Sequence, residues 1–452
     1  MIRVFNSYVP SRTIVLLCGE VAVICLSFSL AIFLRFGQDS ILVLKYEHGM
    51  WKILIVTGLA MLCAHYLEMY DLQRLSSPGE TYFRILTLVG TLAFLLAGLT
   101  LVFPRLLVGR NVFLTGLCIL SLMWVLWRWA FGHLVFLPMF RERVYLLGDG
   151  ERAKRIMEAV RTRSELGMDI IGWANEGNSE VLGKVLRDLG DHTNVDRVIV
   201  ALKDRRTTMP VNELLELRLS GVRIEDGTTL LEKISGQIEV DELHPSWLIF
   251  GDGFRLGERH WYLRRVFSTL LALALCLVTA PFIPIIALIV KLRSPCPVLY
   301  RQQRVGLRGK AFTCYKFRTM RQDAEAGGAK WATDDDPRIT KTGNFMRRTR
   351  MDEIPQFWNV LRGDMAFVGP RPERPEFVEK LTQEIPYYYL RHMARPGITG
   401  WAQVNYGYGS SVEESKEKLR YDLYYIRNIS LTLDLLIAFY TVRAVMVGRG
   451  VR

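Results

Sequence analysis

Residues 266–290 read VFSTLLALALCLVTAPFIPIIALIV and carry no charge, and this stretch decides how the chain meets a membrane. It is long enough for a helix to cross the ~30 Å hydrocarbon core of a bilayer. Pro281 and Pro284 stand near its middle, where a proline removes a helical hydrogen bond and clashes with the preceding turn. The stretch therefore predicts a helix that breaks at the prolines and returns to the membrane face from which it came. A kinked full span is the alternative.

The residues that flank this stretch are basic on both sides. Arg264 and Arg265 precede it, and Lys291 and Arg293 follow it. Because Lys and Arg gather on the cytoplasmic side of membrane proteins, a straight span would leave one basic flank on the opposite side. The flanks therefore favour a re-entrant helix with both ends at the cytoplasmic face.

Four further apolar blocks open the chain, and each is close to the ~20 residues that a membrane-spanning helix needs. Basic residues before the first block, between the second and third, and after the fourth predict that both ends of this region are cytoplasmic. Glu20 and Arg128 fall inside the first and last blocks. They are either a functional intramembrane charge or charges that snorkel to the interface or pair within the bundle. We expect a four-helix transmembrane bundle over residues 1–140, built from the blocks 13–34, 51–70, 85–103 and 111–138.

The composition supports a membrane protein. The chain has 452 residues, of which 50% are hydrophobic, and a net charge of +13. This hydrophobic content excludes a disordered chain, and its arrangement in blocks disfavours an ordinary soluble enzyme. A basic surplus suits loops that face anionic lipid. A nucleic-acid partner is not expected, because the basic stretches lack the interleaved aromatic residues of RNA-binding proteins.

From residue 141 the pattern changes to short apolar strands that alternate with helical stretches. This alternation predicts a parallel sheet flanked by helices, a Rossmann-like domain over residues 141–255. Gly148, Gly150 and Ala153 follow the first strand in a G-x-G-x-x-A pattern, which can seat a phosphate at a helix N-terminus. Asp149 would place a negative charge there. A nucleotide site and a tight turn without a ligand both remain open.

After residue 294 the chain is polar and basic, and three stretches hold candidate functional residues. The first is residues 315–320, YKFRTM. Alternating side chains of a strand point to one face, so Lys316 and Arg318 would project together and away from Phe317. Two cations on one face suit a diphosphate, with Lys as a point charge and Arg as a planar fork. A solvated edge strand is the alternative.

The second stretch, residues 347–359, reads RRTRMDEIPQFWN and places Asp352 and Glu353 after three arginines. The apolar residues that follow at helical spacing predict a helix with Thr349 as its N-cap and both acids in its first turn. The functional alternative is a carboxylate pair held near cations and Mg²⁺, which uses one or two carboxylates plus substrate phosphates. An aspartate beside cations keeps a low pKa and can attack phosphorus to form an acyl phosphate.

The third stretch, residues 369–375, reads GPRPERP. A proline on each side of Arg371 fixes the backbone, and a rigidly aimed arginine is what recognition of a phosphate needs. Residues 395–401, RPGITGW, repeat this style, with Arg395 beside a proline and a glycine-rich turn after it. Such loops could close over a nucleotide or a sugar.

Together with the proline-broken helix, these motifs resemble the monotopic phosphoglycosyl transferases, the bacterial sugar transferases that begin glycan assembly on a polyprenyl carrier. The full plan, with four N-terminal spans and a Rossmann-like domain, is similar to the long subgroup, the polyprenyl-phosphate hexose-1-phosphate transferases. One departure is Arg350-Met351, where Ser-Leu is more usual in the family, and the sugar preference is not carried over. The resemblance rests on the broken helix and on KFRTM (316–320), DEIPQ (352–356), GPRPE (369–373) and RPGITG (395–400).

The resemblance implies a two-step exchange. Asp352 would attack the β-phosphorus of a UDP-sugar and release UMP, and a polyprenyl (undecaprenyl) phosphate would then take the sugar phosphate from Asp352. Glu353 would help hold Mg²⁺, with Asp352 as the other metal ligand, or the incoming phosphate. The family implies UDP-glucose or UDP-galactose as the donor and a role as the first step of exopolysaccharide or other surface glycan assembly. The residues that would neutralise phosphate oxygens are Lys316, Arg318, Arg371 and Arg395.

The expected architecture thus combines membrane helices with α/β structure. The bundle and the Rossmann-like domain precede a re-entrant helix with a small α/β-type catalytic domain over residues 256–452. We expect a multi-pass protein of the bacterial inner membrane, with the catalytic domain on the cytoplasmic face. The expected partners are a UDP-sugar donor, a polyprenyl phosphate acceptor and the lipid bilayer, with a second copy of the chain as a further candidate and no nucleic acid.

Three other classes are weighed against this assignment. A metal-dependent membrane glycosyltransferase would use Asp334, Asp335 and Asp336 as oxygen ligands, although this run could equally be a loop that ends at Pro337. A membrane-bound nucleotide-sugar dehydratase needs a Tyr-x-x-x-Lys pair, and no Tyr lies four residues before a Lys. A non-enzymatic membrane scaffold would leave the arginine and carboxylate cluster without a role.

Overall fold

The computed structural model divides the chain into two compact units. The first is mainly Tyr8–Leu231 and the second mainly Glu232–Arg452. The residues that the structure describes are 2–4, 7–9, 11–46, 48–67, 69–70, 78–103, 109–135, 141–148, 150–163, 166–174, 179–192, 195–202, 208–241, 243, 258–293, 297–324, 328, 336–407 and 411–447.

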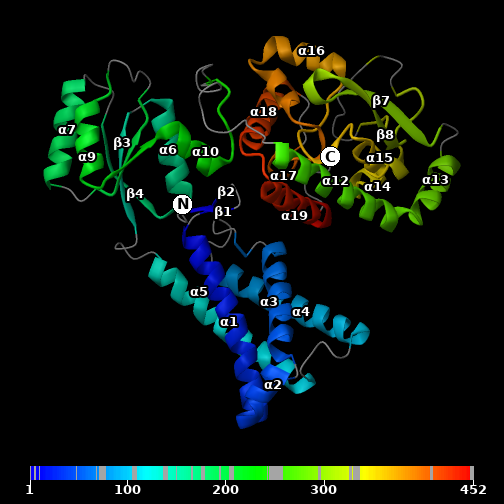
Figure 1. Ribbon diagram of the computed structural model, residues 1–452, viewed down its shortest axis with the longest axis horizontal. Coiled ribbons are helices and arrows are strands. Elements are labelled where there is room, and N and C mark those ends of the chain that lie inside the picture. The colour runs from blue at the N-terminus through cyan, green and yellow to red at the C-terminus, as the bar shows by residue number, and fades with distance from the viewer. Residues whose placement is uncertain are drawn as a thin grey trace. The chain divides into compact units, whose positions relative to one another are not determined.

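The N-terminal unit begins with long apolar helices (Figure 1). Helix α1 packs against α5 and α3, and α4 packs against α3 and α5. By length and composition, five described helical segments could cross a membrane, four of them here (Thr13–Tyr46, Gly49–Tyr66, Tyr82–Thr100, Asn111–His133) and one in the second unit (Trp261–Thr279). The expected helical region with membrane spans is confirmed. Two short strands, β1 (Ile2–Val4) and β2 (Ser7–Val9), precede this region. Its elements are α1 (Ser11–Phe36), η1 (Gly37–Asp39), α2 (Ser40–Tyr46), α3 (Gly49–Tyr66), α4 (Pro78–Val102) and α5 (Arg110–Val135).

The two charged residues inside these apolar helices pair with each other. Arg128 Nη2 lies 2.6 Å from Glu20 Oε1, and the Glu20 side chain has no exposed surface. Tyr70 donates to Glu20 Oε2 at 2.8 Å, and Trp124 Nε1 donates to Oε1 at 3.0 Å. The interpretation of charges paired within the helices is therefore confirmed. A buried carboxylate with this set of partners fixes how α1 packs on α5.

A parallel sheet follows, with the strand order β4-β3-β5-β6. Helices α7 and α9 cover one face, where Leu186 and Leu214 pack on Val198, and α6 lies on the other face (Figure 1). The expected α/β domain is confirmed. Its elements are β3 (Glu142–Leu147), α6 (Glu151–Thr162), β4 (Met168–Ala174), α7 (Ser179–His192), β5 (Arg197–Val200), α9 (Val211–Leu219), β6 (Arg223–Asp226) and α10 (Gly227–Ser235).

The turn after β3 explains the first glycine of the G-x-G-x-x-A pattern. Gly148 has a φ of +124°, and a Cβ at this position would lie 2.9 Å from the carbonyl of Ala201. Backbone conformation and close packing on β5 thus require glycine here without any ligand. Asp149 lies outside the described residues, and nucleotide binding stays a prediction.

The segment after α10 packs with the C-terminal unit. Ile238, Val240 and Leu243 are buried against Leu381 and Leu419. The boundary between the compact units lies before this segment. The sequence places the end of the Rossmann-like domain after it, at residue 255, and this domain limit stays a prediction.

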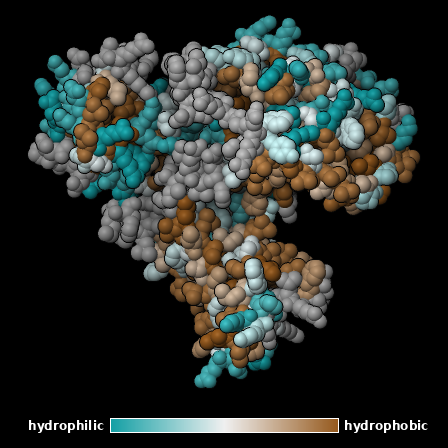
Figure 2. Space-filling model, viewed as in Figure 1, coloured by the Kyte–Doolittle hydropathy of each residue, from teal (hydrophilic) through white to brown (hydrophobic). Residues whose placement is uncertain are grey.

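The C-terminal unit opens with α12 (Glu258–Thr279) and α13 (Phe282–Arg293), separated at Ala280 and Pro281. Pro284 lies in the first turn of α13, where a missing N–H removes no helical hydrogen bond. The predicted break is confirmed at Pro281, whereas Pro284 lies inside α13. Leu270, Leu277 and Leu288 are among the exposed apolar side chains of this pair, and Figure 2 shows apolar residues gathered over α12 and α13.

The rest of the unit is mostly helical, with two separate pairs of strands. β7 and β8 form an antiparallel hairpin, and β9 pairs in parallel with β10. The other helices pack around these pairs (Figure 1). The elements are β7 (Leu299–Val305), η5 (Leu307–Gly309), β8 (Ala311–Phe317), α14 (Lys341–Arg348), η6 (Met351–Glu353), α15 (Gln356–Arg362), β9 (Ala366–Val368), α16 (Pro375–Glu384), η7 (Tyr388–Met393), β10 (Gly397–Thr399), α17 (Trp401–Asn405), α18 (Val412–Arg427) and α19 (Leu431–Val447).

Candidate active site

A cavity of about 430 Å³ lies in the C-terminal unit, within the usual size of small-molecule sites. The β7–β8 hairpin, η6, the loop 369–374 and α18 contribute to its walls. Cations predominate over carboxylates in the lining, so the cavity suits an anionic ligand. Of the expected site residues, it brings together Lys316, Arg318, Asp352, Glu353 and Arg371.

Asp352 and Glu353 lie on η6, a single 3₁₀ turn between α14 and α15. Thr349 is the C-cap of α14, and Arg350 adopts the left-handed conformation with φ 54° and ψ 19°. The expected helix is present as α15, but it begins at Gln356, so the prediction of Thr349 as its N-cap and of both acids in its first turn is wrong. A left-handed residue interrupts a right-handed helix, and it turns the two acids toward the cavity instead.

Glu353 is surrounded by cations. Its Oε1 accepts from Lys316 Nζ at 3.1 Å and from Arg371 Nη2 at 2.8 Å, and Arg350 Nη1 lies 3.4 Å from Oε2. The Glu353 side chain is 8% exposed. Burial alone would raise its pKa, but Arg371, Lys316 and Arg350 together hold the pKa well below its usual range. Glu353 is thus a stable anion that gathers three cations at the cavity.

Asp352 has the opposite surroundings. Within the part of the chain that the structure describes, its carboxylate makes no hydrogen bond or ion pair, although the residue is only 8% exposed. Burial, and next the negative charge of Glu353, raise the pKa of the Asp352 carboxyl. The expected low pKa is therefore wrong, because the positive charges of Lys316, Arg347 and Arg371 do not outweigh desolvation and the negative charge of Glu353.

The end of β8 presents one cation to the cavity and one aromatic residue to the core. Lys316 reaches Glu353, whereas Phe317 on the opposite face is buried. Arg318 follows the strand and also lines the cavity. Its Nε donates to Pro297 O at 3.1 Å, and its guanidinium lies 5.5 Å from the ring centre of Tyr300. The structure thus brings both predicted cations to one cavity.

The loops 369–374 and 395–400 meet backbone to backbone. A Cβ at Gly369 would lie 2.1 Å from Arg395 O, and a Cβ at Gly397 would lie 2.1 Å from Gly369 N. A Cβ at Gly400 would lie 2.3 Å from Gly369 O. Only glycine allows this approach, and the contact fixes the loop that carries Arg371.

Arg395 itself is placed elsewhere. Its guanidinium lies 4.7 Å from the ring centre of Trp261, and it is not among the residues that line the cavity. Burial and the neighbouring Arg265 and Arg264 lower the pKa of its guanidinium. The structure does not bring Arg395 to the acidic pair, and its contact with phosphate stays a prediction.

Asn359 builds the site, although the sequence analysis does not single it out. It is fully buried, its Nδ2 donates to Thr313 O at 2.7 Å, and its Oδ1 accepts from Tyr315 N at 3.2 Å. These bonds link α15 to the backbone of β8, in the way that a neighbouring strand would pair with it. They therefore hold the acidic pair, which precedes α15, in a fixed position relative to Lys316 on β8. The sequence does contain a signal for this role, because Asn359 is an amide on the apolar side of the predicted helix. A buried amide needs hydrogen-bond partners, so it is expected to link the helix to a neighbouring element.

The acidic run 334–336 provides a structural contact at its last member. Asp336 is 5% exposed, and its Oδ1 accepts from Arg338 Nε at 2.8 Å and from Arg338 N at 3.0 Å. Asp334 and Asp335 lie outside the described residues. Among the residues with an assigned position, no group of three or more His, Cys, Asp or Glu side chains could hold a metal. Asp336 and the turn at Pro337 agree with the loop interpretation for the end of the run, and a metal site at Asp334 and Asp335 stays a prediction.

Comparison with known proteins gives consistent matches. The bacterial sugar transferase family model matches residues 259–448. An Aeromonas hydrophila protein named UDP-N-acetylgalactosamine-undecaprenyl-phosphate N-acetylgalactosaminephosphotransferase is 42% identical over 221 residues, 49% of this chain and 52% of its own length. An undecaprenyl-phosphate glucose phosphotransferase of Komagataeibacter xylinus is 32% identical over 320 residues, 68% of this chain and 60% of its own length.

A third relative is matched over a larger share of its own length than the first two. The UDP-glucose:undecaprenyl-phosphate glucose-1-phosphate transferase of Escherichia coli is 35% identical over 323 residues, 67% of this chain and 67% of its own length. The chain thus spans between about half and two thirds of the length of these three relatives. On these matches the chain belongs to the bacterial sugar transferase family.

Proposed function

We propose that this protein transfers a hexose 1-phosphate from a UDP-sugar to undecaprenyl phosphate, as the first step of exopolysaccharide or other surface glycan assembly. One observation carries the proposal: an unpartnered, buried Asp352 stands next to a Glu353 that collects three cations at the wall of a cavity. A free carboxylate is a nucleophile, and the cations can neutralise an incoming diphosphate. The names of the Aeromonas hydrophila and Escherichia coli relatives give a UDP-sugar and undecaprenyl phosphate as their substrates.

In the first step, an oxygen of ionised Asp352 forms a bond to the β-phosphorus of the donor. The bond from that phosphorus to the bridging oxygen breaks, and UMP leaves with this oxygen and its electron pair. Lys316 and Arg371 stabilise negative charge on the phosphate oxygens. Glu353 already holds both cations at the cavity, so they need not reorganise during the reaction. The sugar phosphate stays on Asp352 as an acyl phosphate.

In the second step, a phosphate oxygen of the polyprenyl carrier attacks the phosphorus of this adduct. The bond between phosphorus and the Asp352 oxygen breaks, which returns the carboxylate and releases polyprenyl-diphospho-sugar. Since Glu353 stays ionised, the three cations keep their positions through both steps.

Mg²⁺ belongs to the proposal, and the residues present fit it through Asp352. The Asp352 oxygens accept no hydrogen bond and form no ion pair among the described residues, so they are available to a metal ion. The oxygens of Glu353 face three cations, which would repel a divalent ion. An ion held by Asp352 and the donor phosphates would supply neutralisation of the diphosphate charge.

We further propose that α1, α3, α4 and α5 cross the inner membrane as a four-helix bundle, and that α12 and α13 re-enter it from the cytoplasmic face. Both arms of the broken helix contact the same unit. On α12, Arg265 donates to Val360 O at 2.7 Å and to Leu361 O at 3.0 Å. On α13, Ile286 packs with Phe317. A helix that crossed the membrane would carry one arm away from this unit.

The nucleophile can be tested with donor alone. Purified protein incubated with UDP-glucose, UDP-galactose or UDP-N-acetylgalactosamine should release UMP in a burst and carry a phosphosugar on Asp352, detected by mass spectrometry of the quenched protein. Asp352→Ala should show neither signal. Full turnover by this variant, or an unmodified Asp352 while donor is consumed, would reject the assignment.

The membrane path needs a separate measurement. A membrane-impermeant maleimide added outside intact cells should label Lys45→Cys, in the last turn of α2 on the expected external side, but not Lys310→Cys. Both side chains are exposed. Labelling of Lys310→Cys from outside would favour the kinked full span.

A further inference from the structure

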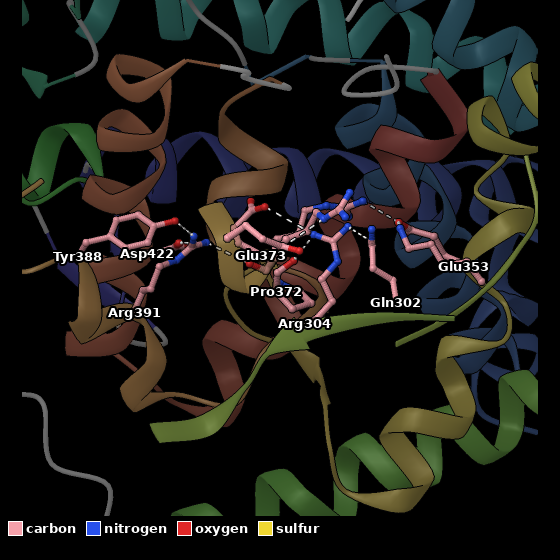
Figure 3. A network of polar contacts seen from close by, with 12 residues as sticks. Gln302, Arg304, Glu353, Pro372, Glu373, Tyr388, Arg391 and Asp422 are labelled. Carbon is pink, nitrogen blue, oxygen red and sulfur yellow. Dashed lines mark hydrogen bonds and ion pairs between the residues drawn. The ribbon is translucent and has the colours of Figure 1, made fainter. Parts of the chain in front are cut away.

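Two arginines that belong to none of the expected site residues bind the main chain of the loop 369–374. Because Pro370 and Pro372 have no N–H groups, the hydrogen bonds that fix this loop go to its carbonyls. The donors at both ends are backbone groups. Those in the middle are the side chains of Arg391 and Arg304 (Figure 3). The carbonyls of Pro370, Arg371, Pro372 and Glu373 accept in turn from Gly397 N (2.9 Å), Arg391 Nη2 (3.1 Å), Arg304 Nη1 (3.0 Å) and Val305 N (2.9 Å).

Arg391 approaches from η7 and is held by an acid on α18. It is 5% exposed, it donates to the hydroxyl of Tyr388, and its Nη2 lies 2.8 Å from Asp422 Oδ2. Asp422 is 1% exposed, and burial raises its pKa to about 6 against the lowering effect of Arg391. A buried ion pair often adds no more stability than an apolar pair of the same volume. Stability alone therefore does not account for a guanidinium directed at the carbonyl of Arg371.

Arg304 approaches the same loop from β7. Its Nη2 donates to Gln302 Oε1 at 2.5 Å, and its Nη1 lies 3.6 Å from Glu373 Oε2. These contacts orient the guanidinium so that Nη1 donates to Pro372 O. The loop is thus held between η7 and α18 on one side and β7 on the other.

We propose that Arg391, with Asp422, and Arg304 are positioning residues that aim the Arg371 guanidinium at the donor phosphate. They fix the carbonyls of Arg371 and Pro372, and the Arg371 side chain extends from this fixed segment to Glu353 Oε1 at 2.8 Å. A displacement of about 1 Å at a catalytic group can lower a rate by about 10²-fold. The inference rests on the proposed function, since it assigns Arg371 to the phosphate.

A double-mutant cycle on the UMP burst tests this role. The first-order rate and the amplitude of the burst are measured for the wild type, Arg391→Gln, Arg371→Ala and the double variant. We expect Arg391→Gln to lower the rate by about 10- to 100-fold with an unchanged amplitude per folded protein. In the Arg371→Ala background the same change should alter the rate less than twofold, because Arg391 acts through Arg371.

Two further variants control for the possibility that Arg391→Gln acts by leaving the buried Asp422 without its cation. Arg391→Gln combined with Asp422→Asn removes both charges and should reproduce the single variant, and Arg304→Lys tests the β7 side if either fails to fold. Arg420→Gln is the matched control, because Arg420 is a partly buried arginine of α18 that pairs with Glu239 and Glu417 instead of with the loop. It should keep the wild-type burst rate.

The outcomes separate the alternatives. An equal fall in rate in both backgrounds would mean that Arg391 contacts phosphate itself, and would overturn the inference. A smaller amplitude with an unchanged rate would mean a purely structural role, with the same consequence. A wild-type protein without any burst would overturn the proposed function as well, whereas additivity in an active protein rejects only the positioning role.

Discussion

Asp352 and Glu353 are neighbours on one 3₁₀ turn, but only Glu353 contacts the cations of the cavity. Lys316, Arg350 and Arg371 all lie within 3.4 Å of its oxygens, whereas the Asp352 carboxylate has no partner in the described structure. One carboxylate is therefore stabilised as an anion and the other is destabilised as an anion. This division of roles leads to opposite effects on stability and activity.

Replacement of Asp352 by Asn should abolish activity and stabilise the fold. The folded-state pKa of Asp352 is raised, so the folded protein loses stability as pH rises through the range between the unfolded and folded pKa values, and the full penalty is present at neutral pH. Asn removes that penalty. We expect a melting temperature at or above the wild-type value and a fall in UMP release of about 10⁴-fold or more. A lower melting temperature would contradict the assigned environment.

Replacement of Glu353 by Gln should have the opposite effect on stability. The folded-state pKa of Glu353 is lowered, so its contribution is present at neutral pH and is lost as pH falls through the folded pKa. Gln leaves three cations without their shared anion. We expect a loss on the order of 2 kcal/mol, below the value for a fully buried pair because the cations are partly exposed. Thermal unfolding in detergent measures it, and an unchanged melting temperature would count against the network.

The pH dependence of the reaction should report Asp352. Only the ionised carboxylate can attack phosphorus, so the acid limb of kcat/KM should lie above the ordinary aspartate value of 3.8. Glu353 contributes to this rise through its negative charge. In the residual activity of Glu353→Gln the acid limb should therefore move to lower pH. Movement to higher pH would show that another group controls the profile.

Much of the fold follows from local sequence patterns. The α/β domain is predictable because strands such as β5 lie on short apolar runs, here residues 198–201, and its helices bury residues at helical spacing. The break between α12 and α13 follows from the steric effect of Pro281. These features depend on neighbours along the chain, and the sequence displays those directly.

The residue types of the site can be predicted from the sequence, but the ion pairs between them cannot. The sequence indicates that Lys316, Arg371 and the two acids belong together, but it does not reveal which acid takes the cations. That outcome depends on the left-handed Arg350, a conformation that no periodicity reports. The support of Arg371 by Arg391 depends on contacts between distant segments, which local patterns do not encode.

Loss of the Lys316 side chain should reduce the rate through electrostatics alone. Lys316→Ala removes a cation 3.1 Å from Glu353 at the cavity, and we expect a fall in kcat/KM of about 10²-fold. Lys184→Ala is the matched control, because Lys184 is an exposed lysine on α7 in the other unit. Its rate should remain within twofold of the wild type. Equal effects of the two changes on the UMP assay would argue against a phosphate role for Lys316.

The glycine contact behind Arg371 should be sensitive to a single methyl group. Gly369→Ala places a Cβ 2.1 Å from Arg395 O, so the two loops must separate, at a cost of about 1–3 kcal/mol. Since this displacement moves Arg371, we expect UMP release to fall by about 10²-fold together with the melting temperature. Gly90→Ala in α4 is the control, because a Cβ there meets no atom within 4 Å and alanine favours a helix. Full activity of Gly369→Ala would show that the loop carrying Arg371 tolerates displacement, and that a rigidly aimed arginine is not required.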